Sequence, residues 1–226
     1  MFRVHNMFRV HNIDFIFQYI SISIYIYIMY GYGFEDYAQA SYKDVDNRPK
    51  EIDDYSYIRS LSNRDMAVYG IPGSLKTRIG FRGTSKTADV IPDLGIALNN
   101  FESTQRYKDD KASLKELIKK RGGVDNIKLT GHSLGGKVAA KLGEEFGIET
   151  NTYNKGSTPL QLQNDVLKGI ACKLMPNTSY CTNSKLVTNH IVKTDPISVW
   201  NIFSTQKNKW YDATETNSHS LKNFID

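Results

Sequence analysis

The spacing of hydrophobic and polar residues switches between two periods along most of the chain. Short apolar runs typical of strands occupy residues 66–69, 77–81, 127–130, 150–153 and 186–192. In residues 107–121 and 134–146, apolar side chains instead recur every three or four positions, which predicts amphipathic helices. A further helix is predicted over residues 89–100, beginning near Pro92. This alternation of strands and helices predicts an α/β fold in which the central strands are parallel.

Three regions lack a clear period. Residues 37–52 are polar and predict a short helix followed by a loop. Residues 154–184 are rich in Asn, Thr, Ser, Gly and Pro, which predicts a loop with one helical turn near residues 162–167. Residues 200–226 are polar with scattered aromatic side chains, and we expect them to be irregular.

The N-terminal region has an unusual composition. The hexapeptide MFRVHN occurs at residues 1–6 and again at 7–12, and an Ile- and Tyr-rich run follows at 13–30. Duplication and dipeptide repetition are typical of low-complexity sequence, and Met29 would then be the true start. We therefore expect residues 1–28 to contribute nothing to the fold, and we divide the chain into a segment 1–36 and a domain 37–226.

Other interpretations of the 13–30 run stay open. Its length is about the minimum for a membrane helix, although Asp14 interrupts it, and membrane association is our second choice. Arg3 and Arg9 ahead of an apolar run are typical of a secretory signal, but the cleavage-like site at residues 38–40 is distant. Alternation of Ile with Ser or Tyr also fits a strand, although both of its faces would then be prone to aggregation.

Composition narrows the classes of partner. A chain of 226 residues with 40% hydrophobic and 23% charged residues is ordinary for a soluble protein of one domain. The net charge of +5 comes from lysines interspersed with acids, so no nucleic-acid partner is expected.

Cys172 and Cys181 form a disulfide if the protein is exported or stay as thiols if it is not. No CxxC, His/Cys cluster or HExxH occurs, and we predict no metal site.

One stretch carries a recognisable chemical pattern. The strand-like residues 127–130 run into Gly131-His132-Ser133-Leu134-Gly135, and a helical run follows at once. In such a G-x-S-x-G turn between a strand and a helix, the serine hydroxyl is presented at the end of the sheet. Any side chain at the glycines would collide with the neighbouring strand or helix. This context predicts that Ser133 is a nucleophile, against the alternative of a Gly-Ser turn without chemistry.

A serine nucleophile needs a base that removes its proton. The chain has five histidines, at positions 5, 11, 132, 190 and 219. The first two lie in the N-terminal repeat, and His132 adjoins Ser133 with its side chain expected to point elsewhere. His190 lies in the middle of a predicted strand. We favour His219, which lies in a loop and follows the candidate acids in the order Ser, acid, His.

Asp195 is the favoured acid. It comes directly after the apolar run 186–192, and active-site groups gather at the carboxyl ends of parallel strands. A turn initiator ahead of Pro196 is the alternative role for this residue. The other acids between Ser133 and His219 are Glu144, Glu145, Glu149, Asp165, Asp212 and Glu215.

Two backbone groups are candidates for an oxyanion hole. The N–H of Leu134 directly follows the nucleophile and begins a helix, whose dipole favours an anion there. The second donor is expected from a loop after an earlier strand. Thr84, following residues 77–81 and Gly83, fits that position.

These motifs in this order resemble the fungal-type, or class 3, lipase family. The resemblance covers roughly residues 69–224 and rests on Phe81-Arg82-Gly83-Thr84, Asp89 with Asp93, the serine motif, Asp195-Pro196 and His219-Ser220-Leu221. It implies an α/β-hydrolase-type three-layer fold and hydrolysis of carboxylic esters, typically acylglycerols, without a cofactor. Ser133, Asp195 and His219 match the family triad, Thr84 and Leu134 match the oxyanion donors, and residues 85–98 match the lid.

The expected partner is therefore a lipid or another ester. One alternative is a catalytically silent hydrolase-like domain that acts at a membrane surface or as a structural protein, anchored by the N-terminal segment. Another is a peptidase or thioesterase, because the same triad serves many acyl substrates.

Overall fold

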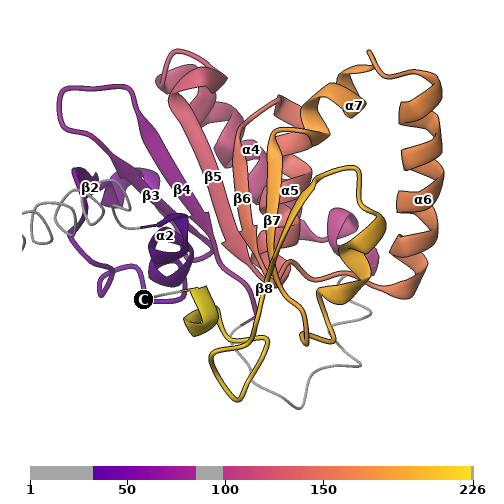
Figure 1. Cartoon of the computed structure of the whole chain (residues 1–226). Helices are drawn as coiled ribbons and strands as arrows, with labels where there is room; N and C mark the ends of the chain where they lie inside the picture. Colours follow the sequence, from indigo (N-terminus) through magenta and orange to yellow (C-terminus); the bar gives the residue numbers. More distant parts are fainter. Residues whose placement is uncertain (1–32, 85–98, 225–226) are drawn as a thin grey trace, which may run out of the picture. The chain divides into compact units, whose positions relative to one another are not determined.

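A computed structural model describes residues 33–84 and 99–224 of the chain (Figure 1). The described residues from Phe34 onward belong to one compact unit. The predicted N-terminal segment up to residue 32 lies outside the described residues. So do most of the predicted helix at 89–100 and the predicted lid at 85–98. Within the described ranges, no helix has the length and apolar character needed to cross a membrane.

Within the described ranges, eight strands form a single sheet in which they lie in chain order. They are β1 (Glu51–Ile52), β2 (Tyr55–Tyr57), β3 (Met66–Gly70), β4 (Thr77–Phe81), β5 (Ile127–His132), β6 (Thr150–Tyr153), β7 (Val187–Val192) and β8 (Lys207–Tyr211). The pairs from β1 to β4 are antiparallel, and those from β4 to β8 are parallel. The prediction of an α/β fold with parallel central strands is confirmed.

The helices cover both faces of this sheet. The α-helices of the described ranges are α2 (Phe34–Ala40), α4 (Gln105–Lys120), α5 (Leu134–Phe146), α6 (Pro159–Leu174) and α7 (Ser179–Ser184). Short 3₁₀ helices occur at Arg59–Leu61 (η1), Phe101–Ser103 (η2), Val124–Asn126 (η3), Val199–Phe203 (η4) and Leu221–Phe224 (η5). Figure 1 shows α2 in front of the sheet and α4 and α5 behind it.

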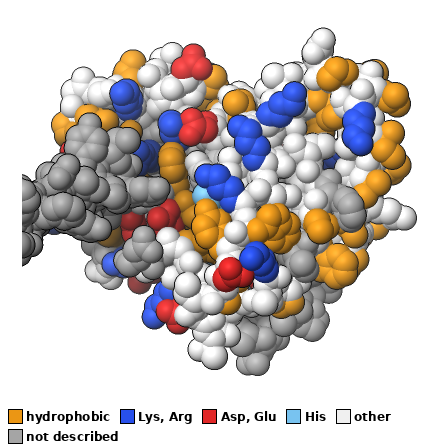
Figure 2. All heavy atoms as spheres, viewed as in Figure 1, with side chains coloured by type: hydrophobic (Ala, Val, Ile, Leu, Met, Phe, Trp, Pro, Cys, Tyr) orange, Lys and Arg blue, Asp and Glu red, His pale blue; other side chains and the backbone are white. Residues whose placement is uncertain are grey.

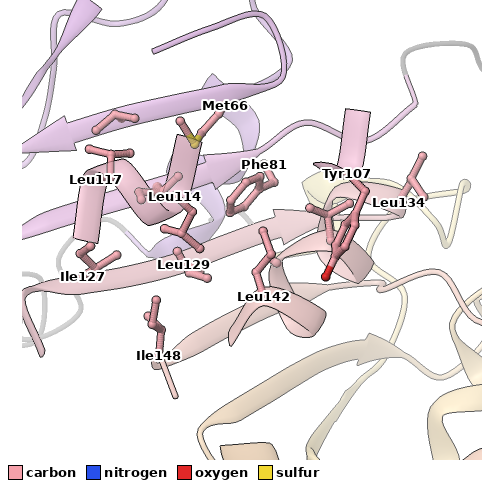
Figure 3. Close-up of a cluster of buried hydrophobic side chains, with 14 of the residues drawn as sticks. Met66, Phe81, Tyr107, Leu114, Leu117, Ile127, Leu129, Leu134, Leu142 and Ile148 are labelled. Carbon is pink, nitrogen blue, oxygen red and sulfur yellow. The ribbon is translucent and has the colours of Figure 1, made fainter. Parts of the chain in front are cut away.

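Two groups of buried side chains hold these layers together. On one face, Phe81 and Leu129 of the sheet pack with Leu114 of α4 and Leu142 of α5 (Figure 3). On the other face, Tyr37 of α2 packs in a separate cluster, together with Ala67 and Tyr69 of β3. Because successive strand residues point to opposite faces, β3 supplies both clusters, with Met66 and Val68 in the first and Ala67 and Tyr69 in the second.

Local signals in the sequence account for the helix ends. The Thr104 hydroxyl accepts a hydrogen bond from the N–H of Tyr107 and so caps α4. Buried positions 107, 110, 114 and 117 of α4 then recur at the helical period. Helix α5 ends at Gly147, whose φ of 70° is the left-handed conformation favoured by glycine.

The structure corrects two of the predictions. Residues 154–184, predicted to be mostly loop, contain α6 and α7, and the tail predicted to be irregular contains β8. Helix α6 begins with Thr158 as its cap and Pro159 in its first turn. Strand β8 is an edge strand with no fully buried residue. Its sequence therefore has no apolar run that would predict a strand.

Helix α6 also exposes much of its apolar surface. Leu160, Leu167, Ile170 and Leu174 are all exposed, and hydrophobic side chains gather along the edge of the view where α6 lies (Figure 2). The structure joins Cys172 of α6 to Cys181 of α7 by a disulfide bond. Of the two alternatives left open by the sequence, the structure therefore contains the bonded pair.

Candidate active site

Ser133 occupies a strained turn between β5 and α5. Its φ of 56° and ψ of −125° lie in a region that residues with a side chain rarely adopt, and such a conformation costs about 1–3 kcal/mol. A β-carbon on Gly131 would collide with the carbonyl of Gly135, and one on Gly135 would collide with the carbonyl of Phe81. The glycines on both sides of the serine are therefore required by close backbone packing, as expected from the sequence.

Asp195 and His219 are in direct contact. The Nδ1 atom of His219 lies 2.9 Å from Oδ2 of Asp195, and Asp195 is fully buried. Its other oxygen, Oδ1, accepts a hydrogen bond of 3.1 Å from the backbone N–H of Ile197. Since a carboxylate only accepts, Nδ1 of His219 carries a proton, and in the neutral ring Nε2 then has a lone pair. That tautomer leaves Nε2 able to remove a proton from a neighbouring group.

His132 links this pair to the serine turn. Its Nε2 lies 2.7 Å from the backbone carbonyl oxygen of His219, and its Nδ1 lies 2.8 Å from the hydroxyl of Tyr42. A carbonyl oxygen can only accept, so Nε2 donates to it and Nδ1 accepts from Tyr42. Burial, followed by the charge of His219, lowers the pKa of His132 to about 3. His132 is therefore neutral and holds the loop of His219 beside the residue that precedes the serine.

The serine hydroxyl itself is nearly enclosed. Ser133 is 3% exposed, and its side chain makes no hydrogen bond to any residue that the structure describes. The rings of His132 and His219 lie 4.9 Å apart, centre to centre. No hydrogen bond joins Ser133 to His219 among the described contacts, so proton transfer between them requires a closer approach of Ser133 and His219, and catalytic hydrogen bonds commonly tighten only when substrate is bound.

The two candidate oxyanion donors follow neighbouring parallel strands. Leu134 is the first residue of α5, directly after β5, and Thr84 lies three residues beyond the end of β4. The start of α5 packs closely on the end of β4, because Gly135 abuts the backbone of Phe81 and Arg82. Both segments therefore meet at the carboxyl edge of the sheet, where α/β folds place ligands.

The other sequence candidates lie elsewhere. His190 bonds through Nδ1 to the Tyr211 hydroxyl, at 2.8 Å, and through Nε2 to Oδ1 of Asn151, at 3.1 Å. Both its nitrogens are thus occupied within the sheet. In the described residues, His219 makes its carboxylate contact with Asp195 and with none of the alternative acids.

Sequence reasoning missed Tyr42. This residue lies 90 positions before its partner His132, in a polar stretch without a motif. The sequence feature that relates most directly to the position of Tyr42 is Gly83, because a β-carbon there would collide with the Tyr42 hydroxyl. In the described ranges, no group of three or more His, Cys, Asp or Glu side chains could hold a metal ion.

No protein-family model matches the chain, and no curated protein sequence matches it. The resemblance to class 3 lipases consequently rests on the short motifs of the sequence. The contact of Asp195 with His219 and the strained turn at Ser133 are observations independent of that resemblance.

Proposed function

We propose that this protein is a serine hydrolase that cleaves carboxylic esters, with Ser133 as nucleophile, His219 as base and Asp195 as the orienting acid. The observation that carries the proposal is the bond between Nδ1 of His219 and buried Asp195. It fixes the tautomer that a general base needs, at a position next to the strained serine turn. Acylglycerols are the proposed substrates on the strength of the motif resemblance alone.

The reaction proceeds in two acyl transfers. As Oγ of Ser133 attacks the ester carbonyl carbon, Nε2 of His219 takes the hydroxyl proton, and Asp195 stabilises the imidazolium. The N–H groups of Leu134 and Thr84 donate hydrogen bonds to the oxyanion. The bond to the alcohol breaks while His219 returns the proton to the leaving oxygen. Water then attacks the acyl-enzyme with the help of His219, and the carboxylic acid leaves.

Two measurements on the full chain test this function. The wild-type protein should react with a fluorophosphonate probe and hydrolyse p-nitrophenyl esters, and a series of acyl lengths would reveal its preference. Ser133→Ala and His219→Gln should each lower kcat by roughly 10⁴-fold. Ser184→Ala, which removes a buried hydroxyl bonded to the Cys181 carbonyl, is the matched control and should keep full activity.

Absence of labelling and of ester hydrolysis in the folded wild-type protein would contradict the proposal. That outcome would favour the alternative of a catalytically silent hydrolase-like domain. Near-normal activity in Ser133→Ala would show that another residue is the nucleophile.

A further inference from the structure

Helix α6 exposes its apolar side chains and buries a charged one. Of its sixteen residues, Asp165 is the one that is buried. A surface helix of a globular protein ordinarily buries its apolar side instead. Five large apolar side chains of α6 are each at least 40% exposed, and they are Leu160, Val166, Leu167, Ile170 and Leu174. This apolar surface is therefore not part of the protein core.

The five side chains share one side of α6, and we call them the α6 stripe. At 3.6 residues per turn they fall within an arc of about 120°, and Asp165 points in roughly the opposite direction. Gln163 is the one polar residue of the helix inside that arc. The exposed residues Lys173 and Lys168 lie beyond its two edges. A lysine in such a place can lay its alkyl chain along an apolar surface and keep its ammonium group in a polar layer.

The exposed apolar side chains of the described residues are concentrated around this helix. Of eleven large hydrophobic side chains that are exposed, ten lie at positions 160–210, and Leu75 is the exception. The ten include Trp200 and Ile202 of η4, which contacts α6, and also Trp210 of β8. Figure 2 shows hydrophobic side chains along the edge of the view where α6 lies. Exposed apolar surface of this extent is typical of a binding surface.

The exposed charges of the same part of the chain have one sign. Residues 150–211 contain two acids, Asp165 and Asp195, and both are buried. Lys193 is paired with Asp212 at 2.8 Å. The other exposed lysines of this stretch are at positions 168, 173, 185, 207 and 209. This stretch therefore presents apolar side chains and positive charges, without an exposed acid of its own.

The combination favours a lipid surface over a second copy of the chain. In a symmetric dimer built on the α6 stripe, the same patch of each copy would meet the other, so lysines would approach lysines. At an anionic membrane the two features act together. Leucine, isoleucine and tryptophan side chains enter the boundary between headgroups and acyl chains, and lysines meet the anionic headgroups.

We propose that the α6 stripe, together with Trp200 and Ile202 of η4, is a docking surface for an anionic lipid membrane, with α6 lying in the membrane plane. The disulfide bond between Cys172 and Cys181 ties α6 to α7, so the helix is held to the domain while it presents this side. The surface uses none of the triad residues and is independent of the proposed ester hydrolysis. It is also separate from the N-terminal segment, which the sequence offered as an anchor.

Sedimentation of the full chain with lipid vesicles tests the surface. The protein should bind vesicles of equal parts phosphatidylserine and phosphatidylcholine, and added salt should weaken this binding. Vesicles of phosphatidylcholine alone should bind it roughly tenfold more weakly, because they lack the anionic headgroups that attract the lysines.

Two matched variants locate the contact. Leu167→Glu places a negative charge within the α6 stripe and should weaken binding to the anionic vesicles roughly tenfold or more. Leu75→Glu is the control, because it makes the same change at a leucine that is 49% exposed between β3 and β4. This control should bind as the wild type does. Should Leu167→Glu not fold, as judged by circular dichroism, Ile170→Glu is tested by the same criteria.

The proposal is overturned if the full chain binds neither kind of vesicle or binds both equally. It is equally overturned if Leu167→Glu binds as tightly as Leu75→Glu, because the membrane contact then lies elsewhere in the chain. A dimer that Leu167→Glu dissociates, seen by analytical ultracentrifugation without binding to vesicles, would assign the α6 stripe to a second copy instead.

Discussion

At the scale of single residues, Tyr42 connects the two halves of the candidate site. Its hydroxyl donates to Nδ1 of His132, and it lies so close to Gly83 that a β-carbon there would collide with it. Through His132 it reaches the carbonyl of His219, and it packs against the residue that precedes the candidate oxyanion donor Thr84. One phenol therefore contacts both the residue that holds the loop of the base and the loop of the oxyanion donor.

Tyr42→Phe should lower kcat for ester hydrolysis by roughly fivefold with little change in KM, since a hydrogen bond of this kind contributes about 1 kcal/mol. The same substitution should lower the free energy of unfolding by about 1 kcal/mol. Steady-state kinetics and urea unfolding measure the two effects. Tyr107→Phe, which loses a hydroxyl bonded to Glu145 away from the site, is the control and should keep the wild-type kcat. Equal kinetics for both variants would show that Tyr42 has a structural role only.

The residues of the site differ in how far the sequence could reveal them. Ser133 lies in a motif whose glycines and flanking strand and helix are contiguous in the sequence. The local sequence pattern is therefore enough to predict its turn. Asp195 was predicted from its place after an apolar strand, because parallel strands share one carboxyl edge. Tyr42 depends on a contact between segments 90 residues apart, and no local pattern encodes such a contact.

At the scale of elements, burial decides what the sequence reveals. The central strands and α5 were predicted because their apolar positions face the core and recur with a regular period. In α6 the apolar side chains face outward instead, in a segment of turn-forming composition. The cap at Thr158 and Pro159 is a recognisable start signal for this helix. Strand β8 is formed by pairing with β7 and has no apolar run of its own, so the local sequence does not predict it.

This difference in burial predicts opposite outcomes for two leucines. Leu167 of α6 is 63% exposed, so Leu167→Lys should change the free energy of unfolding by no more than about 0.5 kcal/mol. Leu142 of α5 is fully buried in the cluster of Figure 3, so Leu142→Ala should cost about 2–5 kcal/mol through lost contacts and a cavity. Urea unfolding of both variants measures the contrast. A loss of several kcal/mol in Leu167→Lys would mean that the outer face of α6 is covered in the protein.

At the scale of the whole described unit, α2 closes one face of the sheet. Tyr37 and Ala38 have no exposed surface, and the Phe34 carbonyl accepts a hydrogen bond from Thr130 of β5. Tyr37 also packs edge-on against Tyr55 and Tyr69. The short helix is thus part of the core, although it lies at the beginning of the compact unit.

Two truncations test where the cooperative unit begins. Removing residues 1–33 leaves α2 and both hydrophobic layers intact, so the melting temperature should stay within a few degrees of the full chain. Removing residues 1–40 strips Tyr37 from the sheet. An aromatic side chain buries on the order of 200 Å², worth about 5 kcal/mol, a large part of the roughly 5–15 kcal/mol that stabilises a typical domain. The shorter chain should therefore lose its cooperative thermal transition. A chain lacking residues 1–33 that fails to fold would show that the N-terminal segment supplies stability to the sheet.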